Sequence, residues 1–211
     1  MATYLYKMQL PSALLENAVI QFSKLPGIGK KTALRLVLHL MKQDLNEVQF
    51  FGETIAKMRR DIQFCQRCYN VSDGNICSIC SNSQRNHHMI CVVENIRDVI
   101  AIESTQQFNG TYHVLDGIIS PLDGIGPEQL NIDSLVQRIQ QEAIEELVFA
   151  LSPNIQGDTT IYYIQKKMEH LTCRITTIAR GIAFGGELEY ADEMTLARSI
   201  ANRLPIQQYV K

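Results

Sequence analysis

The stretch CQRCYNVSDGNICSIC, residues 65–80, contains four of the six cysteines of the chain and separates two regions that differ in the pattern of their apolar residues. Its cysteines, Cys65, Cys68, Cys77 and Cys80, follow the spacing Cys-x2-Cys-x8-Cys-x2-Cys. Two residues between cysteines allow both thiolates of a tight turn to face one ion, and two such turns supply the four ligands of a tetrahedral zinc site. The spacing therefore predicts one structural Zn²⁺ per chain, holding together a segment too small to bury its own core.

Disulfide bonds and a redox-active pair are the alternatives for this quartet. The first residues lack the basic start and unbroken apolar run of a secretion signal, and no stretch approaches the roughly 18 apolar residues that cross a membrane. We therefore expect a cytoplasmic protein without membrane contact, whose reducing surroundings disfavour disulfides. A redox pair would not need a second copy. The other cysteines, Cys91 and Cys173, lie in apolar runs and are expected to be core residues.

The composition is that of an ordinary globular protein of 211 residues, with 45% hydrophobic and 20% charged residues. The formal net charge of −2 gives no general sign of nucleic-acid binding. If DNA is a partner, the basic charge that binds it must be local.

Upstream of the quartet, residues from about 12 to 64 show the apolar periodicity of helices, interrupted by a glycine-containing turn at residues 26–29. Gly27 and Gly29 allow a tight turn with outward N–H groups, and a helix is expected to begin directly after it. Free N–H groups at a helix N-terminus form a cradle for a phosphate oxygen. Residues 17–43 contain no Asp or Glu but five basic residues, Lys24, Lys30, Lys31, Arg35 and Lys42.

These features predict a DNA-binding hairpin that comprises Lys24, Gly27, Gly29, Lys30, Lys31 and Arg35. Lys31 and Arg35 are four residues apart and so share one helix face. Such a site grips phosphates and reads no bases, so binding should depend steeply on salt and weakly on sequence. An ordinary helical corner with a solvated basic face is the alternative.

Downstream of the quartet, residues 88–183 alternate between short apolar runs and helical stretches, which predicts an α/β domain with a mostly parallel sheet. The expected strands are 89–93, 111–115, 146–151 and 172–178, and the expected helices lie near 97–107, 133–144 and 158–170. Glu94 follows the first strand and Asp98 lies one helical turn later. The carboxyl ends of strands are where such sheets form their sites.

The order of these parts resembles the RecR family of bacterial recombination and repair proteins. The loop YHVLDGIISPLDGIGPE, residues 112–128, is similar to the family's YHVL-x-G-x-x-SPL-x-G-x-GP pattern. Asp116 stands where the family has glycine, which could tighten a turn or add a carboxylate; a surface loop without a ligand is the alternative for this segment. The resemblance implies a helical helix-hairpin-helix region (1–64), a four-cysteine zinc finger (65–80), a Toprim domain (88–183) and a C-terminal helical tail (184–211).

Toprim enzymes carry Asp-x-Asp-x-x-Gly after a later strand, and its carboxylates hold Mg²⁺. The matching stretch here is SPNIQG, residues 152–157, in which the glycine remains and both aspartates are replaced. Mg²⁺ requires anionic oxygens near octahedral positions. We therefore expect a chain that is not an enzyme and a weak cation site or none in the pocket of Glu94, Asp98, Asn154 and Asp158. A Toprim-type, Mg²⁺-dependent nuclease or topoisomerase is the alternative.

The tail resembles the family's acidic segment, often described as Walker-B-like. No glycine-rich phosphate-binding loop accompanies it, so ATP hydrolysis is not expected. A helix of about 12 residues starting near Asp192 carries an apolar stripe that we expect to pack on a neighbour, Met194, Ala197, Ile200 and Ala201. The resemblance implies that the neighbour is another subunit of a homo-oligomer, a ring-shaped tetramer.

The resemblance further implies a mediator that helps load recombinase onto single-stranded DNA with the partners RecO and RecF. It would bind single- and double-stranded DNA without sequence preference, in a nucleoid-associated cytoplasmic pool. Lys31 and Arg35 fall where the family's DNA-contacting basic residues lie. The zinc segment would fix the hairpin region relative to the Toprim domain.

Overall fold

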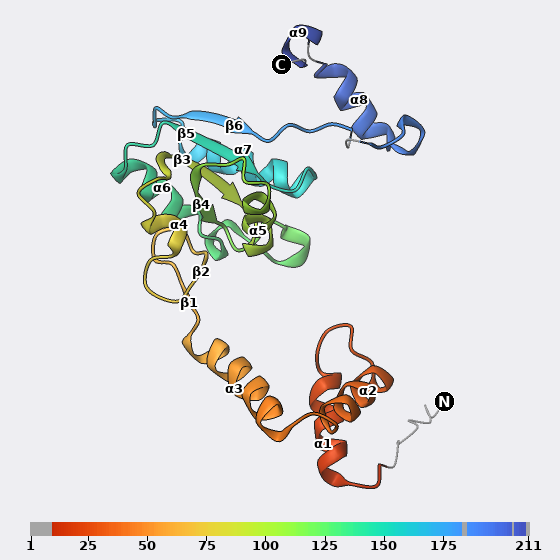
Figure 1. Ribbon diagram of the computed structural model, residues 1–211. Coiled ribbons are helices and arrows are strands. Elements are labelled where there is room, and N and C mark those ends of the chain that lie inside the picture. Colours follow the sequence, from red (N-terminus) through yellow and green to blue (C-terminus); the bar gives the residue numbers. More distant parts are fainter. Residues whose placement is uncertain (1–9, 183–184, 204, 210–211) are drawn as a thin grey trace. The chain divides into compact units, whose positions relative to one another are not determined.

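The computed structural model describes residues 10–182, 185–203 and 205–209, and the chain divides into two units, Met1–Asp61 and Ile62–Lys211 (Figure 1). The cysteine segment therefore belongs to the same unit as the α/β region. The expected regions 1–64, 88–183 and 184–211 each include a few residues that lie outside the described ranges.

Three helices build the first unit: α1 (Ala13–Ser23), α2 (Lys30–Leu40) and α3 (Leu45–Asp61). α1 begins after Ser12, whose Oγ accepts a hydrogen bond from the N–H of Leu15 at 3.5 Å. The predicted helical hairpin region is thereby confirmed.

The core of this unit is small and lies between α1 and α2. Its buried residues are Val19, Ala33 and Val37. No residue of α3 is buried, and several of its large apolar side chains are exposed, among them Leu45, Phe50, Phe51 and Ile55. Within the first unit, α3 therefore presents an apolar surface that α1 and α2 do not cover.

The cysteine segment folds as two turns beside a short antiparallel pair of strands, β1 (Gln63–Phe64) and β2 (Val71–Ser72). The one-turn helix α4 (Ser78–Ser81) follows the second turn. The four cysteine side chains form a buried cluster of their own, with Ile79 packed against it. This small cluster takes the place of an apolar core.

Parallel strands form the main sheet of the second unit, in the order β4-β3-β5-β6 (Figure 1). They are β3 (Asn86–Val93), β4 (Gly110–Val114), β5 (Glu146–Ala150) and β6 (Arg174–Thr177). Each lies on one of the expected apolar runs, so the predicted α/β fold is confirmed. β3 begins earlier than expected because Asn86 already pairs with Gly110 of β4.

Helices cover both faces of this sheet. Ile90 and Val92 of β3 point into a core with α6 (Ile132–Gln141) and α7 (Ile155–Lys167), whereas Cys91 and Val93 point toward α5 (Ile96–Ser104). Burial on both faces explains why β3 is apolar at successive positions. Cys91 is a core residue, as expected, and Cys173 is half-buried against the first of these cores.

Capping side chains set the helix boundaries that the apolar pattern misplaced. α7 begins at Ile155 rather than near residue 158, because the Asn154 side chain accepts a hydrogen bond from the N–H of Gly157 at 2.8 Å. α5 begins directly after Asn95, which forms a capping box with Asp98.

The tail contains the short helix η3 (Leu188–Tyr190), α8 (Glu193–Ala201) and α9 (Ile206–Tyr209). Asp192 caps α8 as expected, but the helix has 9 residues rather than 12, since it stops at Asn202 ahead of Pro205. Met194 and Ile200 of the expected apolar stripe are 65% and 63% exposed, so the stripe does not pack against the described part of the chain. Among the described helices, none is long and apolar enough to cross a membrane.

Candidate nucleic-acid interface and metal centre

The turn between α1 and α2 leaves its backbone open to a ligand. Gly27 has a φ of +78°, a left-handed conformation that favours glycine, and the N–H of Ile28 donates to the carbonyl of Leu25 at 3.0 Å. A Cβ atom added at Gly27 or Gly29 would meet nothing within 4 Å. Neither glycine is therefore required by packing inside the chain.

α2 begins at this turn, and no side chain accepts hydrogen bonds from the N–H groups of its first turn. Gly29 is the N-cap residue, no side chain caps the helix, and no acidic residue lies in the first turn. The first turn instead contains Lys30 and Lys31, and the first intrahelical hydrogen bond runs from the N–H of Ala33 to the carbonyl of Gly29 at 2.9 Å. A helix N-terminus is partially positive, so two lysines in its first turn add to that charge and favour an anion at this end. The arrangement is suited to binding a phosphate group.

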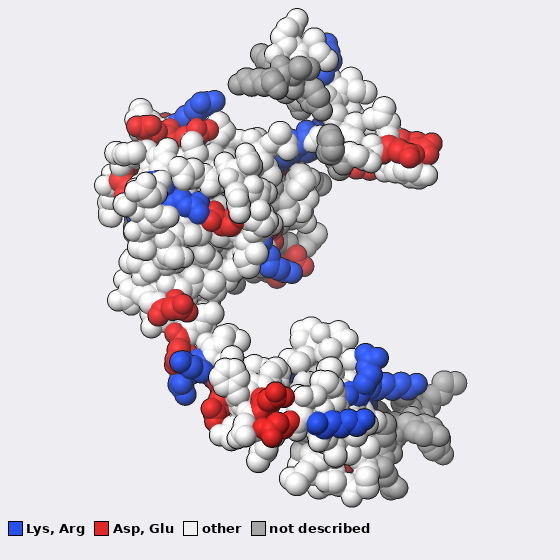
Figure 2. Space-filling model, viewed as in Figure 1, with Lys and Arg blue, Asp and Glu red and all other residues white. Residues whose placement is uncertain are grey.

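A shallow groove of about 380 Å³ continues this basic surface along one face of α2. It is lined by Lys31, Leu34, Arg35, Leu38, His39 and Lys42. The structure thus brings Lys31 and Arg35 together on one helix face, as their spacing predicts. Figure 2 shows Lys and Arg side chains gathered over the α1–α2 hairpin.

The residues predicted to contact DNA are all exposed: Lys24, Gly27, Gly29, Lys30, Lys31 and Arg35. Lys24 is the C-cap of α1, and its Nζ donates to Oε1 of Gln21 at 2.9 Å. Among the described residues, none of these lysines and arginines forms an ion pair with a carboxylate. His39 also lines this groove but was not among the predicted residues. Its position four residues after Arg35 places it on the same helix face.

The four cysteines of the quartet converge on one point. Their Sγ atoms all lie within 4.8 Å of one another, and all four side chains are buried. Sγ of Cys68 and Sγ of Cys77 are 3.6 Å apart, close to the separation of about 3.8 Å that tetrahedral ligands with Zn–S bonds of about 2.3 Å would have. The donor set therefore fits one Zn²⁺ ion, which would hold the two turns of the segment together.

The disulfide alternative for the quartet does not fit this geometry. All six cysteines are free thiols, and 3.6 Å is far longer than the S–S bond of about 2.05 Å in a disulfide. Hydrogen bonds from the thiols of Cys68 and Cys80 lower the pKa of Cys77. The same cluster and its burial raise the pKa of Cys68 and of Cys80, so without an ion one thiolate is shared among hydrogen-bonded thiols. His87 and His88 lie outside the cluster.

The side chains expected to form one acidic pocket at the end of β3 do not lie together in one cluster. Oε2 of Glu94 accepts a hydrogen bond from the Ser152 hydroxyl at 2.9 Å. Oδ2 of Asp98 accepts one from the N–H of Asn95 at 2.9 Å, where it caps α5. In the described part of the chain, the cysteine quartet is the only group of three or more His, Cys, Asp or Glu side chains whose ligand atoms lie within 4.8 Å of one another.

The other two residues of this pocket are also engaged within the chain. Asn154 caps α7, and Oδ1 of Asp158 lies 2.6 Å from Nη1 of Arg180. Nη2 of Arg198 lies 3.5 Å from the second oxygen of Asp158. The structure therefore places Asp158 in ion pairs with Arg180, which follows β6, and with Arg198 of the tail, rather than beside Glu94 in a carboxylate cluster.

The loop after β4 is a folded turn rather than an open one. Asp116 has a φ of +66°, so of its two expected roles the structure supports the tightening of a turn. The N–H of Ser120 donates to the carbonyl of Ile125 at 3.0 Å, and the reverse bond is 2.9 Å long. The short helices η1 (Pro121–Asp123) and η2 (Pro127–Gln129) fill this segment.

Comparisons with known families cover nearly all of the chain. Residues 15–59 match the RecR helix-hairpin-helix family, and residues 62–82 match the RecR four-cysteine zinc finger domain. Residues 88–179 match the Toprim domain, and residues 181–204 match the RecR C-terminal family. These matches follow the same order as the structural parts described above.

Curated relatives are similar over almost their whole length. Recombination protein RecR of Bacteroides thetaiotaomicron is 56% identical over 92% of this chain and 95% of its own. The protein of the same name from Flavobacterium johnsoniae is 54% identical over 97% of this chain and 99% of its own. A third, from Amoebophilus asiaticus, is 56% identical over 93% of this chain and 98% of its own. The chain belongs to the RecR family.

Proposed function

We propose that the chain binds DNA through the α1–α2 hairpin and acts as a non-catalytic mediator of recombination and repair, which helps load recombinase onto single-stranded DNA. The name of its relatives, Recombination protein RecR, supports the recombination role. The observation that carries the DNA-binding part is the uncapped N-terminus of α2, where Lys30 and Lys31 stand in a first turn without acidic residues.

The hairpin would grip the sugar-phosphate backbone. A phosphate oxygen would accept hydrogen bonds from the free N–H groups that follow Gly29, and Lys31 and Arg35 would contact neighbouring phosphates along the groove. Such contacts position a protein on DNA but carry no sequence information. The site would therefore accept single- and double-stranded DNA of any sequence.

Substitution of Lys31 and Arg35 tests this proposal. In DNA-binding titrations over a range of salt concentrations, Lys31→Ala and Arg35→Ala should each reduce the slope of log K against log[salt] by roughly one. The matched control is Lys166→Ala, since Lys166 of α7 is also an exposed helical lysine but pairs with Glu169. Unchanged affinity and slope in both hairpin variants would contradict the assignment of DNA to α2.

A Toprim-type nuclease or topoisomerase is the second candidate, because the chain retains the Toprim fold and Glu94 at the end of β3. The dispersed carboxylates speak against it, since phosphoryl chemistry of this kind uses metal ions clamped by several carboxylates. Incubation of supercoiled plasmid with the protein and Mg²⁺ or Mn²⁺ separates the two functions. Nicking that Glu94→Gln abolishes would favour the enzyme.

We further propose that the chain assembles into a ring-shaped homo-oligomer, a tetramer, and works with RecO and RecF in a nucleoid-associated cytoplasmic pool. The apolar side chains left exposed on α3 and α8, such as Phe50, Met194 and Ile200, support assembly because contiguous exposed apolar surface marks interaction sites. RecO and RecF follow from family membership rather than from any one residue.

A further inference from the structure

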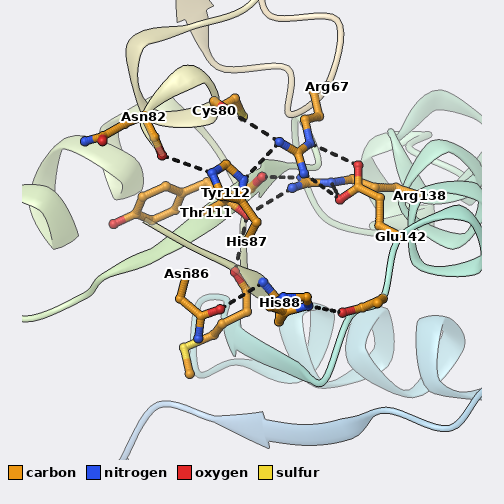
Figure 3. A network of polar contacts seen from close by, with 12 residues as sticks. Arg67, Cys80, Asn82, Asn86, His87, His88, Thr111, Tyr112, Arg138 and Glu142 are labelled. Carbon is orange, nitrogen blue, oxygen red and sulfur yellow. Dashed lines mark hydrogen bonds and ion pairs between the residues drawn. The ribbon is translucent and has the colours of Figure 1, made fainter. Parts of the chain in front are cut away.

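Arg67 lies inside the metal-binding segment, between Cys65 and Cys68, but its side chain reaches out of it (Figure 3). Its Nε donates to Oε1 of Glu142 at 3.0 Å, and its Nη2 donates to Oε2 of the same carboxylate at 2.9 Å. Glu142 is the C-cap residue of α6 in the α/β domain. Two parallel bonds between a guanidinium and a carboxylate are the strong, directional form of this contact.

The same guanidinium also faces the second half of the metal-binding segment. Its Nη1 donates to the carbonyl oxygen of the ligand residue Cys80 at 3.4 Å and to Nδ1 of His87 at 3.0 Å. His87 must then carry its proton on Nε2, which lies 3.0 Å from the carbonyl of Asn82 and donates to it. One side chain thus connects both cysteine turns to α6.

A second arginine extends this network into the sheet (Figure 3). Arg138 is 6% exposed, and its Nε donates to Oε2 of Glu142 at 3.2 Å. Its Nη1 donates to the carbonyl of Tyr112 at 2.7 Å, and its Nη2 donates to Oγ1 of Thr111 at 2.9 Å. Tyr112 and Thr111 belong to β4, the edge strand that faces the cysteine segment.

The charges of this network complement those of a loaded metal centre. Two arginines and one glutamate sum to +1, whereas four thiolates and one Zn²⁺ sum to −2. Arg67 lies next to this negative centre, since its Nη1 donates to the carbonyl of Cys80, and Arg138 contacts it through the shared Glu142. Arg67 and Glu142 are 26% and 28% exposed, so water screens the attraction only in part.

A backbone contact makes a second connection from the ligands to the sheet. The N–H of Val114 at the end of β4 donates to the carbonyl of Cys68 at 2.9 Å. The ring of Tyr69 packs edge-on against His113 of β4, with ring centroids 5.5 Å apart. The cysteine segment therefore covers part of the open edge of the sheet, and a shift of Cys68 would expose that edge.

From these contacts we propose that Arg67 is a positioning residue that couples metal binding to the docking of the zinc finger on the Toprim domain. Arg67 stabilises the four-thiolate centre by its charge and, through Glu142, holds the finger against α6 and β4. Retention of zinc and order at the edge of the sheet therefore rise and fall together. This coupling is independent of whether the hairpin binds DNA.

Zinc affinity of the purified full-length chain tests the proposal. In competition titrations with a chromogenic chelator, Arg67→Ala should bind Zn²⁺ roughly 10- to 100-fold more weakly. This is the range seen when a residue that hydrogen-bonds to a metal ligand is removed. Glu142→Gln weakens the two-point contact that holds Arg67 but also removes a negative charge near the thiolates, so its zinc affinity should fall less than that of Arg67→Ala. Arg60→Ala is the matched control, because Arg60 makes an exposed pair with Asp61 outside the finger, and it should bind as the wild type does.

Amide hydrogen exchange at Val114 supplies the second readout, because its N–H donates directly to the ligand residue Cys68. Zinc removal from the wild type should speed this exchange, and in zinc-loaded Arg67→Ala it should already be fast. Arg67→Lys, which keeps the charge but loses the two-point contact, should lie between the two and serves if the alanine variant fails to fold. Wild-type affinity in Arg67→Ala, or in Glu142→Gln with Val114 still protected, would overturn the coupling.

Discussion

Two helices of this chain, α2 and α7, begin directly after a loop that carries a candidate site, and their N-termini are satisfied in opposite ways. The N-terminus of α7 is satisfied from within, since Asn154 caps it and Asp158 lies in its first turn. The N-terminus of α2 has no side-chain cap and carries Lys30 and Lys31 instead of an acidic residue. The partial positive charge of α7 is therefore neutralised by the chain itself, whereas that of α2 is left for an external anion.

The glycines at the starts of α7 and α2 also differ, because the chain itself packs against only one of them. A Cβ atom at Gly157 would collide with the carbonyl oxygen of Ser152, while one at Gly29 would meet nothing within 4 Å. Gly157 is thus required for the close packing of α7 on the end of β5. Packing alone therefore explains the glycine at this position, whichever residues flank it.

The largest effect is expected from the packed glycine. Gly157→Ala should lower the free energy of unfolding by about 3 kcal/mol or more, because a backbone carbonyl cannot move aside as a flexible side chain can. Gly29→Ala is the matched substitution at the open junction and should cost about 0.5 kcal/mol or less. Denaturant unfolding of both variants measures the difference. Equal stabilities would show that the two junctions do not differ in packing.

Features that arise from a repeated sequence pattern were predicted, whereas those that depend on a single side chain were missed. Continuous apolar runs predicted the strands, because a strand that is buried on both faces is apolar at successive positions, as at residues 90–93 of β3. The cysteine spacing gave the metal ligands because four thiols within one segment have few other arrangements. Helix starts were missed at Asn154, since capping depends on one side chain rather than on a repeated pattern.

Long-range polar contacts were beyond prediction for a related reason. Arg67 meets Glu142 across 75 positions of sequence, and nothing in the local pattern of either residue indicates its partner. Asp158 was expected in the same pocket as Glu94, but it pairs with Arg180, which follows β6, and no local sequence pattern indicates that partner. Sequence patterns identify which residue types a site contains, and the fold decides which of them meet.

A smaller effect is expected from the cap of α7. Asn154→Ala should lower the free energy of unfolding by about 1 kcal/mol, because the N–H of Gly157 loses its acceptor. Asn154→Ser, which retains a capping oxygen, should restore most of the loss. Thermal unfolding of the three proteins provides the measurement. A stable Asn154→Ala variant would mean that Asp158 alone satisfies this helix end.

The smallest change in stability should come from giving α2 the kind of cap that α7 has. Gly29→Asp should stabilise the fold by only about 0.5 kcal/mol, because the carboxylate accepts hydrogen bonds from the first turn and lies beside Lys30 and Lys31. The same carboxylate would occupy the place of a DNA phosphate, so DNA binding should weaken and its salt slope should fall by roughly one. Gly29→Asn caps the helix without charge and should weaken binding less, while Gly29→Ala leaves the N–H groups free and should bind as the wild type does. If Gly29→Asp binds DNA normally, the open N-terminus of α2 is not where phosphate lies, and the contrast with α7 is one of stability alone.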